Sequence, residues 1–260
     1  MIKKIFLFII LVVLAVGIGL FLTQSARNNP IAVIRKLNLD KRTQLKGYPI
    51  TFRILYMGFV PVGEASVRNL GVERYKEKDA YHVSVDGKTT GFVTPLFNAA
   101  FVADSWIDKE KIHTLKFSQT LLRPDKPKDI KEVFYDQVNN VMEHKGVKRQ
   151  ILPDTQDPLS VMFFISRQKL ALGKEFDINI NTNQKNYRLV LKVVKKEEYA
   201  TDIGKTGVWV VEGDVKRRDK SSRHSSTMTL WLMDNSSNTP LLARVMTNGG
   251  LIVARLMNIE

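Results

Sequence analysis

The chain contains no cysteine among its 260 residues. This absence excludes disulfide bonds, thiol catalysis, cysteine-based metal sites and a lipid anchor attached through cysteine. Histidine is also scarce, and no two of its copies have the spacing of a zinc site on one helix or strand: His82, His113, His144 and His224. We therefore predict neither a metal site nor a cofactor.

Acidic residues are few relative to basic ones, with 26 Asp and Glu against 40 Lys and Arg and a formal net charge of +14. Residues 1–26 carry only Lys3 and Lys4, so 38 − 26 = +12 remains on the rest of the chain. A field of this sign favours anionic partners such as lipid headgroups, lipopolysaccharide, anionic polymers or nucleic acid. The alternative is a solvated basic surface without a ligand.

Only one apolar run approaches the length of a bilayer span, residues 5–22, and it follows Lys3 and Lys4. It is longer than the apolar region of most cleaved signals, and the lysines favour a cytoplasmic N-terminus. We predict that residues 1–26 form an uncleaved signal anchor and transmembrane helix. The protein would then be single-pass in the inner membrane, with its C-terminal domain in the periplasm and no contact with nucleic acid. A cleaved, secreted form is the alternative.

Beyond the anchor, the pattern indicates a linker over residues 27–47 and a single β-rich domain over residues 48–260. Apolar residues alternate with polar ones from Ile50 to Tyr56, as in a half-buried strand. Turn signals recur at regular spacing, among them Asp86-Gly87 and Asn248-Gly249-Gly250. About eleven short strands result, which predicts an all-β fold, an antiparallel curved sheet or barrel.

One stretch departs from this alternation, Asp157–Gly173. Asp157 suits the N-cap of a helix, Pro158 its first position, and Gly173 a left-handed residue at its end. The apolar residues between them point to nearly every side: Leu159, Val161, Met162, Phe163, Phe164 and Ile165. A helix that is apolar all round is buried, so we expect it across the mouth of the barrel or against the concave face of the sheet.

Three stretches together resemble a known family. They are Tyr56–Ala65, an aromatic residue followed by Gly58, Gly63, Glu64 and Ala65; Asp157-Pro158-Leu159-Ser160 with its helix and Leu172-Gly173; and Trp231-Leu232 followed by Pro240. The family consists of exported bacterial proteins known as domain of unknown function 3108, and the likeness covers residues 48–258. It implies a β-rich domain in the cell envelope, and it implies no activity and no catalytic residues.

Two patterns suggest catalysis only superficially. Ser166 and Lys169, with Lys205-Thr206-Gly207 further on, match two motifs of penicillin-binding enzymes, but the middle motif is missing and the two are too close. Asp104 and Asp108 share a strand face, as paired carboxylates do in glycoside hydrolysis, although acids on an outward face are usually solvated. We therefore assign no catalytic residue.

The strongest binding candidates are the cations of the loop Lys216–His224, namely Lys216, Arg217, Arg218 and Arg223, together with Trp106 and Trp231. The cations suit phosphate groups of a lipid or polymer, unless the loop is simply a solvated hairpin tip. The tryptophans would line an apolar cavity, unless they belong to the core. We predict a non-enzymatic envelope protein that binds a lipid or lipid-linked glycan. The alternatives are an assembly factor working through an unidentified protein partner, or a hydrolase whose site the sequence does not reveal.

Overall fold

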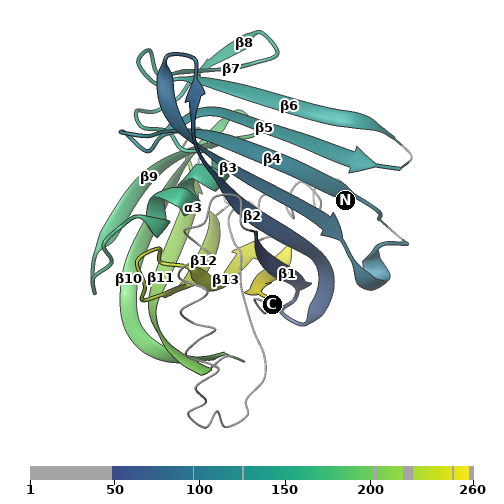
Figure 1. The fold of residues 1–260 in the computed structure, drawn as a ribbon, viewed down its shortest axis with the longest axis vertical. Coiled ribbons are helices and arrows are strands. Elements are labelled where there is room, and N and C mark those ends of the chain that lie inside the picture. Colours follow the sequence, from purple (N-terminus) through teal and green to yellow (C-terminus); the bar gives the residue numbers. More distant parts are fainter. Residues whose placement is uncertain are drawn as a thin grey trace.

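The computed structural model describes residues 49–257, apart from residues 96, 125, 202–203, 219–224 and 248. This part of the chain forms a single 14-stranded antiparallel sheet, one α-helix and one 3-10 turn (Figure 1). The elements are β1 (Ile50–Tyr56), β2 (Val60–Tyr75), β3 (Lys78–Thr89), η1 (Gly91–Val93), β4 (Ala100–Asp108), β5 (Thr114–Arg123), β6 (Lys126–Asp136), β7 (Val141–His144), β8 (Val147–Gln150), α3 (Pro158–Ser166), β9 (Glu175–Thr182), β10 (Lys185–Thr201), β11 (Gly204–Arg217), β12 (Ser225–Met233), β13 (Pro240–Thr247) and β14 (Gly250–Leu256).

The strand order is that of an up-and-down barrel opened at one place. It runs β8-β7-β6-β5-β4-β3-β2-β1-β14-β13-β12-β11-β10-β9, so strands that follow each other in sequence are neighbours, and β1 also pairs with β14. The exception is β8 and β9, which form the two edges of the sheet and flank α3 in the sequence. The predicted antiparallel, curved all-β fold is confirmed, with an opening in place of full closure.

The strands differ from the prediction both in number, fourteen against about eleven, and in their bounds, for local reasons. The stretch 141–150 is two strands, because Lys145 and Gly146 turn the chain with positive φ angles of 51° and 76°. Asp86-Gly87, predicted as a turn, lies inside β3. Gly87 is needed there because an added Cβ would come within 2.4 Å of the Phe101 ring on β4. Glycine thus marks close packing at this position rather than a change of direction.

The predicted helix is present but shorter than expected. Asp157 is its N-cap and Pro158 its first residue, as predicted, but α3 ends at Ser166 and Gly173 does not terminate it. Gly173 instead lies in the connection to β9, with φ +78° and its N–H donating to the Val193 carbonyl at 2.8 Å. The remainder of the predicted helix, residues 167–173, is irregular chain that leads from α3 to β9.

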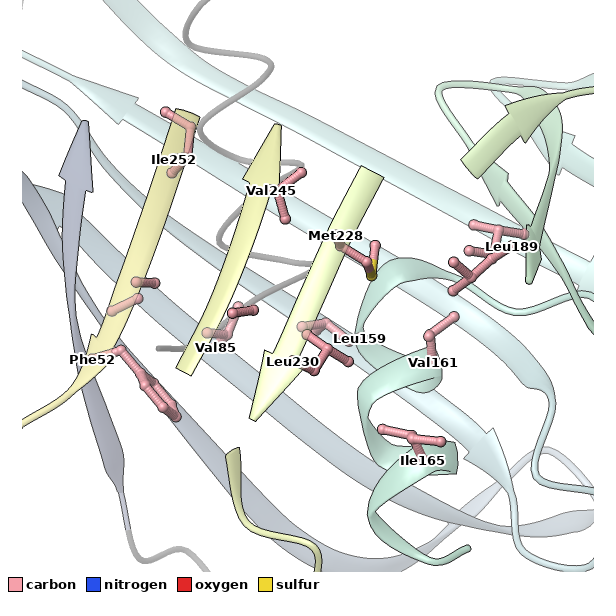
Figure 2. Close-up of a cluster of buried hydrophobic side chains, with 14 of the residues drawn as sticks. Phe52, Val85, Leu159, Val161, Ile165, Leu189, Met228, Leu230, Val245 and Ile252 are labelled. Atoms are coloured by element: carbon pink, nitrogen blue, oxygen red, sulfur yellow. The ribbon is translucent and has the colours of Figure 1, made fainter. Parts of the chain in front are cut away.

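The core lies on the concave side of the sheet, where α3 packs among side chains from both halves (Figure 2). Leu159, Val161 and Ile165 of α3 are buried. They belong to one cluster with residues of distant strands, which include Phe52, Val85, Leu189, Leu230 and Ile252. Since the helix is apolar on almost every side, it fills the interior instead of covering a surface.

The segment that leads into α3 joins the two sides of the opening. Gln156 forms a parallel bridge to β9, with its N–H donating to the Asn179 carbonyl and its own carbonyl accepting from Asn181, both at 2.8 Å. Nearby, the Asn186 side chain donates to the Gln150 carbonyl at 3.0 Å. We call this set of contacts the seam. It closes the barrel outline with a loop and side chains in place of a strand pair.

The antiparallel order places the strand connections on two opposite rims. On one rim, which we call the basic rim, lie the last residues of β1, β3, β5, β9, β11 and β13 and the first residues of the strands that follow them. On the other lie the last residues of β2, β4, β6, β10 and β12 and the first residues of the strands that follow them; we call it the helix rim because both ends of α3 bind there. The predicted anchor and linker, residues 1–47, lie outside the described residues. In the described part, no helix has the length and apolar character needed to cross a bilayer.

Candidate functional site

A buried carboxylate, Asp157, holds the N-terminus of α3 to the sheet. One of its oxygens accepts from the backbone N–H groups of Leu159 and Ser160, at 2.7 and 3.1 Å. The other oxygen accepts from the hydroxyls of Ser105 on β4 and Thr114 on β5, at 2.5 and 2.8 Å. Burial raises the pKa of Asp157 above its usual 3.8, while these hydrogen bonds limit the rise. The group is completely enclosed, which suits a structural role.

The C-terminus of α3 is capped by a side chain from the β12–β13 connection. The amide of Asn238 donates to the carbonyls of Ile165 and Gln168, at 3.1 and 2.6 Å. Ile165 is in the last turn of α3, where carbonyls lack an intrahelical partner, and Gln168 lies just beyond the helix end. Together with Asp157, Asn238 fixes both ends of α3 at the helix rim. No local pattern near the helix predicts this cap, because Asn238 lies about 70 residues further along the chain.

The basic rim carries the predicted cations. Lys216 is exposed at the end of β11, with Asp214 Oδ2 2.5 Å from its ammonium group. Arg218 is also exposed and donates to the Asn179 side chain at 2.8 Å. Arg217 is half-buried and lies opposite Tyr187 in the register of β10 and β11. Arg223 lies outside the described residues. The structure thus brings three of the four predicted cations together on one rim.

Further cations, outside the predicted set, join this rim from β6 and β10. Lys126 and Lys128 are exposed at the start of β6, and Lys185 is exposed at the start of β10. Lys131 points to the concave side, where its ammonium group donates to Asn183 of the β9–β10 turn at 3.1 Å. Burial lowers the pKa of Lys131, an effect that Asp129 partly offsets. A periodicity analysis of β6 would have placed Lys131 on the inner face with Val133.

The β1–β2 turn adds apolar side chains to the basic rim. Phe59 is 75% exposed and Met57 49%, and Met246 at the end of β13 is 50% exposed. Met57 and Phe59 lie in the motif that includes Gly58, and Met246 lies opposite Leu251, whose carbonyl accepts from the Met57 N–H. The rim therefore combines cations with solvent-facing apolar groups, whereas the ends of α3 are bound at the opposite rim.

Trp106 faces outward, and its ring and indole N–H contact neighbouring side chains of the same sheet. The His82 ring stacks on it with centroids 4.5 Å apart, and the Lys116 ammonium lies 5.0 Å from its centroid. Its indole N–H donates to Glu73. Ser105, the preceding residue, points inward to Asp157, so Trp106 cannot line the concave interior. The structure thus places it away from the basic rim cations with which the sequence analysis grouped it.

Trp231, on β12, is half-buried. Its indole N–H donates to Glu197 at 2.9 Å, and the guanidinium of Arg244 lies 5.2 Å from its ring. It packs against a small cluster of Val208, Met233 and Leu241. These contacts describe a packed side chain with a satisfied polar atom.

The remaining motif residues have identifiable packing roles. Gly58 has φ +86° in the β1–β2 turn, a conformation that favours glycine. An added Cβ at Gly63 would lie 2.8 Å from the Lys88 carbonyl oxygen. Glu64 lies directly opposite Arg53 on β1 and Lys88 on β3, where unlike charges on neighbouring strands are favourable.

The two carboxylates considered for catalysis have separate partners. Asp104 lies 3.0 Å from His82, whereas Asp108 pairs with Lys78 at 2.7 Å and accepts from the backbone of Glu110 and Lys111. Among the described residues, no three His, Asp or Glu side chains form a group able to hold a metal ion.

These features define a barrel-like protein made from one antiparallel sheet, with a buried helix in its single gap. A family model described as "Protein of unknown function (DUF3108)" matches residues 50–257. The chain belongs to this family, which confirms the resemblance of its motifs.

Comparison with solved structures supports the fold. The chain is similar to a β-barrel-like protein of domain of unknown function DUF1849 from Brucella abortus, with 11% identity, 82% of this chain and 98% of that chain covered, and a TM-score of 0.53. At this identity the likeness concerns the fold alone. The hypothetical lipoprotein YmcC from Escherichia coli matches with 11% identity, coverage of 90% and 99%, and a TM-score of 0.34, too low to carry a conclusion. A comparison with curated proteins found no match.

Proposed function

We propose that this chain is a non-enzymatic, membrane-anchored protein of the cell envelope. It binds an anionic, amphipathic component, a lipid or a lipid-linked glycan, at its basic rim. The observation that carries this proposal is the composition of that rim, where Lys216, Arg218 and Lys185 accompany the exposed apolar groups Phe59 and Met57. A headgroup phosphate suits the cations and an acyl chain suits the apolar groups.

The location in the envelope is supported by the sequence. The apolar run of residues 5–22 follows two lysines and has nearly the length of a bilayer span. An inner-membrane anchor with the domain in the periplasm would hold the basic rim near membrane lipids. The secreted form, produced by cleavage of the same segment, would still meet anionic envelope components.

Binding without catalysis is supported by the side chains that the sequence offered for chemistry. Asp104 and Asp108 are each engaged by a different basic partner. Ser166, the serine of the serine–lysine pattern, donates its hydroxyl to the Phe163 carbonyl at 2.7 Å at the end of α3. Lys205, from the second motif, is paired with Glu198 on the neighbouring strand. None of these contacts activates a nucleophile.

Charge reversal tests the proposal. The full chain would be extracted from membranes in mild detergent, and the lipids that copurify with it identified by mass spectrometry. In the variant K216E/R217E/R218E we expect loss of the anionic lipid or lipid-linked glycan bound by the unmodified chain.

The matched control is K76E/K109E/K111E, which changes three exposed cations in the β2–β3 and β4–β5 connections of the helix rim. This variant should retain the bound component. Equal retention in both variants, or a preparation of the unmodified chain without anionic lipid, would reject the proposal.

The edge of the sheet favours a second candidate, an assembly factor with a protein partner. In the described part of the chain β8 pairs with no strand other than β7, so, apart from the Gln150 carbonyl that accepts from Asn186, its outer edge can accept a further strand. A photo-crosslinker at Val147, 51% exposed on β8, would capture a partner in intact cells if this function operates. Absence of any protein adduct would argue against it.

A further inference from the structure

The β1–β2 turn combines an unusual backbone conformation with an exposed apolar side chain. Met57 and Gly58 have φ angles of +54° and +86°, and the Phe59 N–H donates to the Tyr56 carbonyl at 3.3 Å. Tight hairpin turns with positive φ at both central residues favour Asn-Gly, because asparagine tolerates the left-handed region. Here a methionine occupies that position, and the next side chain is a phenylalanine that is 75% exposed. Backbone strain and apolar exposure therefore coincide at one turn.

This turn is braced by the neighbouring hairpin. The Met57 N–H donates to the Leu251 carbonyl at 2.7 Å, and the Tyr56 hydroxyl donates to the Gly249 carbonyl at 3.0 Å. Position 250 favours glycine, because its φ is +112° and an added Cβ would lie 3.0 Å from the Tyr56 oxygen. The turn is thus fixed by contacts with β14. It presents Phe59 to solvent from a rigid support, which lowers the entropy cost of binding through this side chain.

The charges of the basic rim indicate which kind of surface the β1–β2 turn contacts. Exposed cations occupy the same rim at the ends of β6, β10 and β11, among them Lys126, Lys185 and Lys216. Apolar groups at a tip and cations around it suit the interface of an anionic bilayer, with side chains among the acyl chains and ammonium groups at the phosphates.

The length of the preceding chain permits this contact. Residues 27–48 separate the predicted anchor from β1, and 22 residues span at most about 70 Å when extended. The seven residues of β1 span only about 23 Å, so the turn can reach the membrane although the linker joins the opposite end of β1.

We propose that the β1–β2 turn docks on an anionic lipid bilayer by inserting Met57 and Phe59 between the lipids, with the basic rim cations against the phosphates. The inference rests on the proposed function, since it names the bilayer itself as the surface to which the basic rim binds. The domain then stands with the basic rim toward the membrane and the helix rim away from it.

The lack of cysteine makes a direct test simple, because one introduced cysteine is labelled uniquely. The full chain carrying Phe59→Cys would be labelled with an environment-sensitive nitrobenzoxadiazole fluorophore and reconstituted into vesicles containing phosphatidylglycerol. We expect emission at position 59 to shift to shorter wavelength and to be quenched by spin-labelled lipid. High salt should reverse part of the shift, because it screens the cations. Val138→Cys, at an 84% exposed position in the β6–β7 connection on the helix rim, is the control and should show no shift.

A second label shows whether the natural side chain is responsible. With the fluorophore at Met246→Cys on the same rim, the shift should appear in the chain that retains Phe59 and be lost in Phe59→Asp. Emission typical of water at both rim positions would overturn the inference, as would equal insertion into neutral phosphatidylcholine vesicles.

The two proposals fail separately. If position 59 stays in water while K216E/R217E/R218E still removes the copurifying lipid, the docking inference is wrong and the proposed function stands. If position 59 inserts but the charge reversal changes no bound lipid, the proposed function is wrong in its ligand site.

Discussion

At the scale of single residues, Asp157 should contribute most clearly to the stability of the fold. It caps α3 and accepts two hydroxyls from the sheet while fully buried. Asp157→Ala removes the N-cap and leaves buried donors without an acceptor, so the free energy of unfolding should fall by about 3 kcal/mol. Urea denaturation of the full chain in detergent, followed by far-ultraviolet circular dichroism, measures this change.

Asp157→Asn is the informative comparison for that measurement. The amide oxygen can still accept from the backbone N–H groups of Leu159 and Ser160. The loss should therefore be smaller than for alanine. Equal losses in the two variants would show that the helix cap contributes little.

His82 should couple stability to pH. Partial burial lowers its pKa, but the hydrogen bond to Asp104 and the charge of Glu73 outweigh this effect, so the pKa lies above its usual 6.5. A raised pKa in the folded state means that the stabilisation is complete below 6.5 and is lost as the pH rises through the folded-state pKa. The free energy of unfolding should therefore fall between about pH 6 and 8.

Two measurements check the His82 prediction. Nuclear magnetic resonance titration should give a His82 midpoint above that of an unfolded peptide, and Asp104→Asn should lower it. In His82→Gln the decline of stability over the same pH range should be weaker. An unchanged decline would assign the pH dependence to other groups.

At the scale of elements, the β1–β2 turn separates stability from membrane contact. Met57→Asn places a residue that tolerates the left-handed region where φ is +54°. We expect the free energy of unfolding to rise by about 0.5–1 kcal/mol, because the strain of methionine is relieved. The same variant, labelled at Met246→Cys, should show a smaller emission shift in anionic vesicles. A destabilised variant would contradict the turn geometry.

The bounds of α3 and β3 show which features of secondary structure local sequence can predict. The start of α3 was predictable because Asp157 and Pro158 are adjacent in sequence and act on the first turn. Its end was not, since the cap is Asn238 from a distant connection. Likewise, Asp86-Gly87 has the composition of a turn, and only the Phe101 ring on the next strand reveals why glycine is needed. The bounds of a helix or strand cannot be predicted from local composition where they depend on contacts with residues distant in sequence.

Local composition likewise predicted only part of the candidate site. The cations Lys216, Arg217 and Arg218 were visible as a charge run, and the structure places them at one rim. Phe59 was not recognised, because an apolar residue in an alternating strand pattern suggests burial, whereas its exposure depends on the turn that precedes it. Trp106 was grouped with the site from its residue type alone.

At the scale of the whole molecule, the seam decides whether the sheet behaves as open or closed. The amide of Asn181 lies on edge strand β9 yet donates to the Gln156 carbonyl at 2.8 Å. The amides of β8 that face away from β7 have no such acceptor in the described part of the chain. Because exchange requires a hydrogen bond to open, Asn181 should exchange as slowly as interior strands, and the outer amides of β8 much faster. Hydrogen exchange resolved by residue checks this. Fast exchange at Asn181 would mean that the seam opens in solution and that α3 has access to solvent from that side.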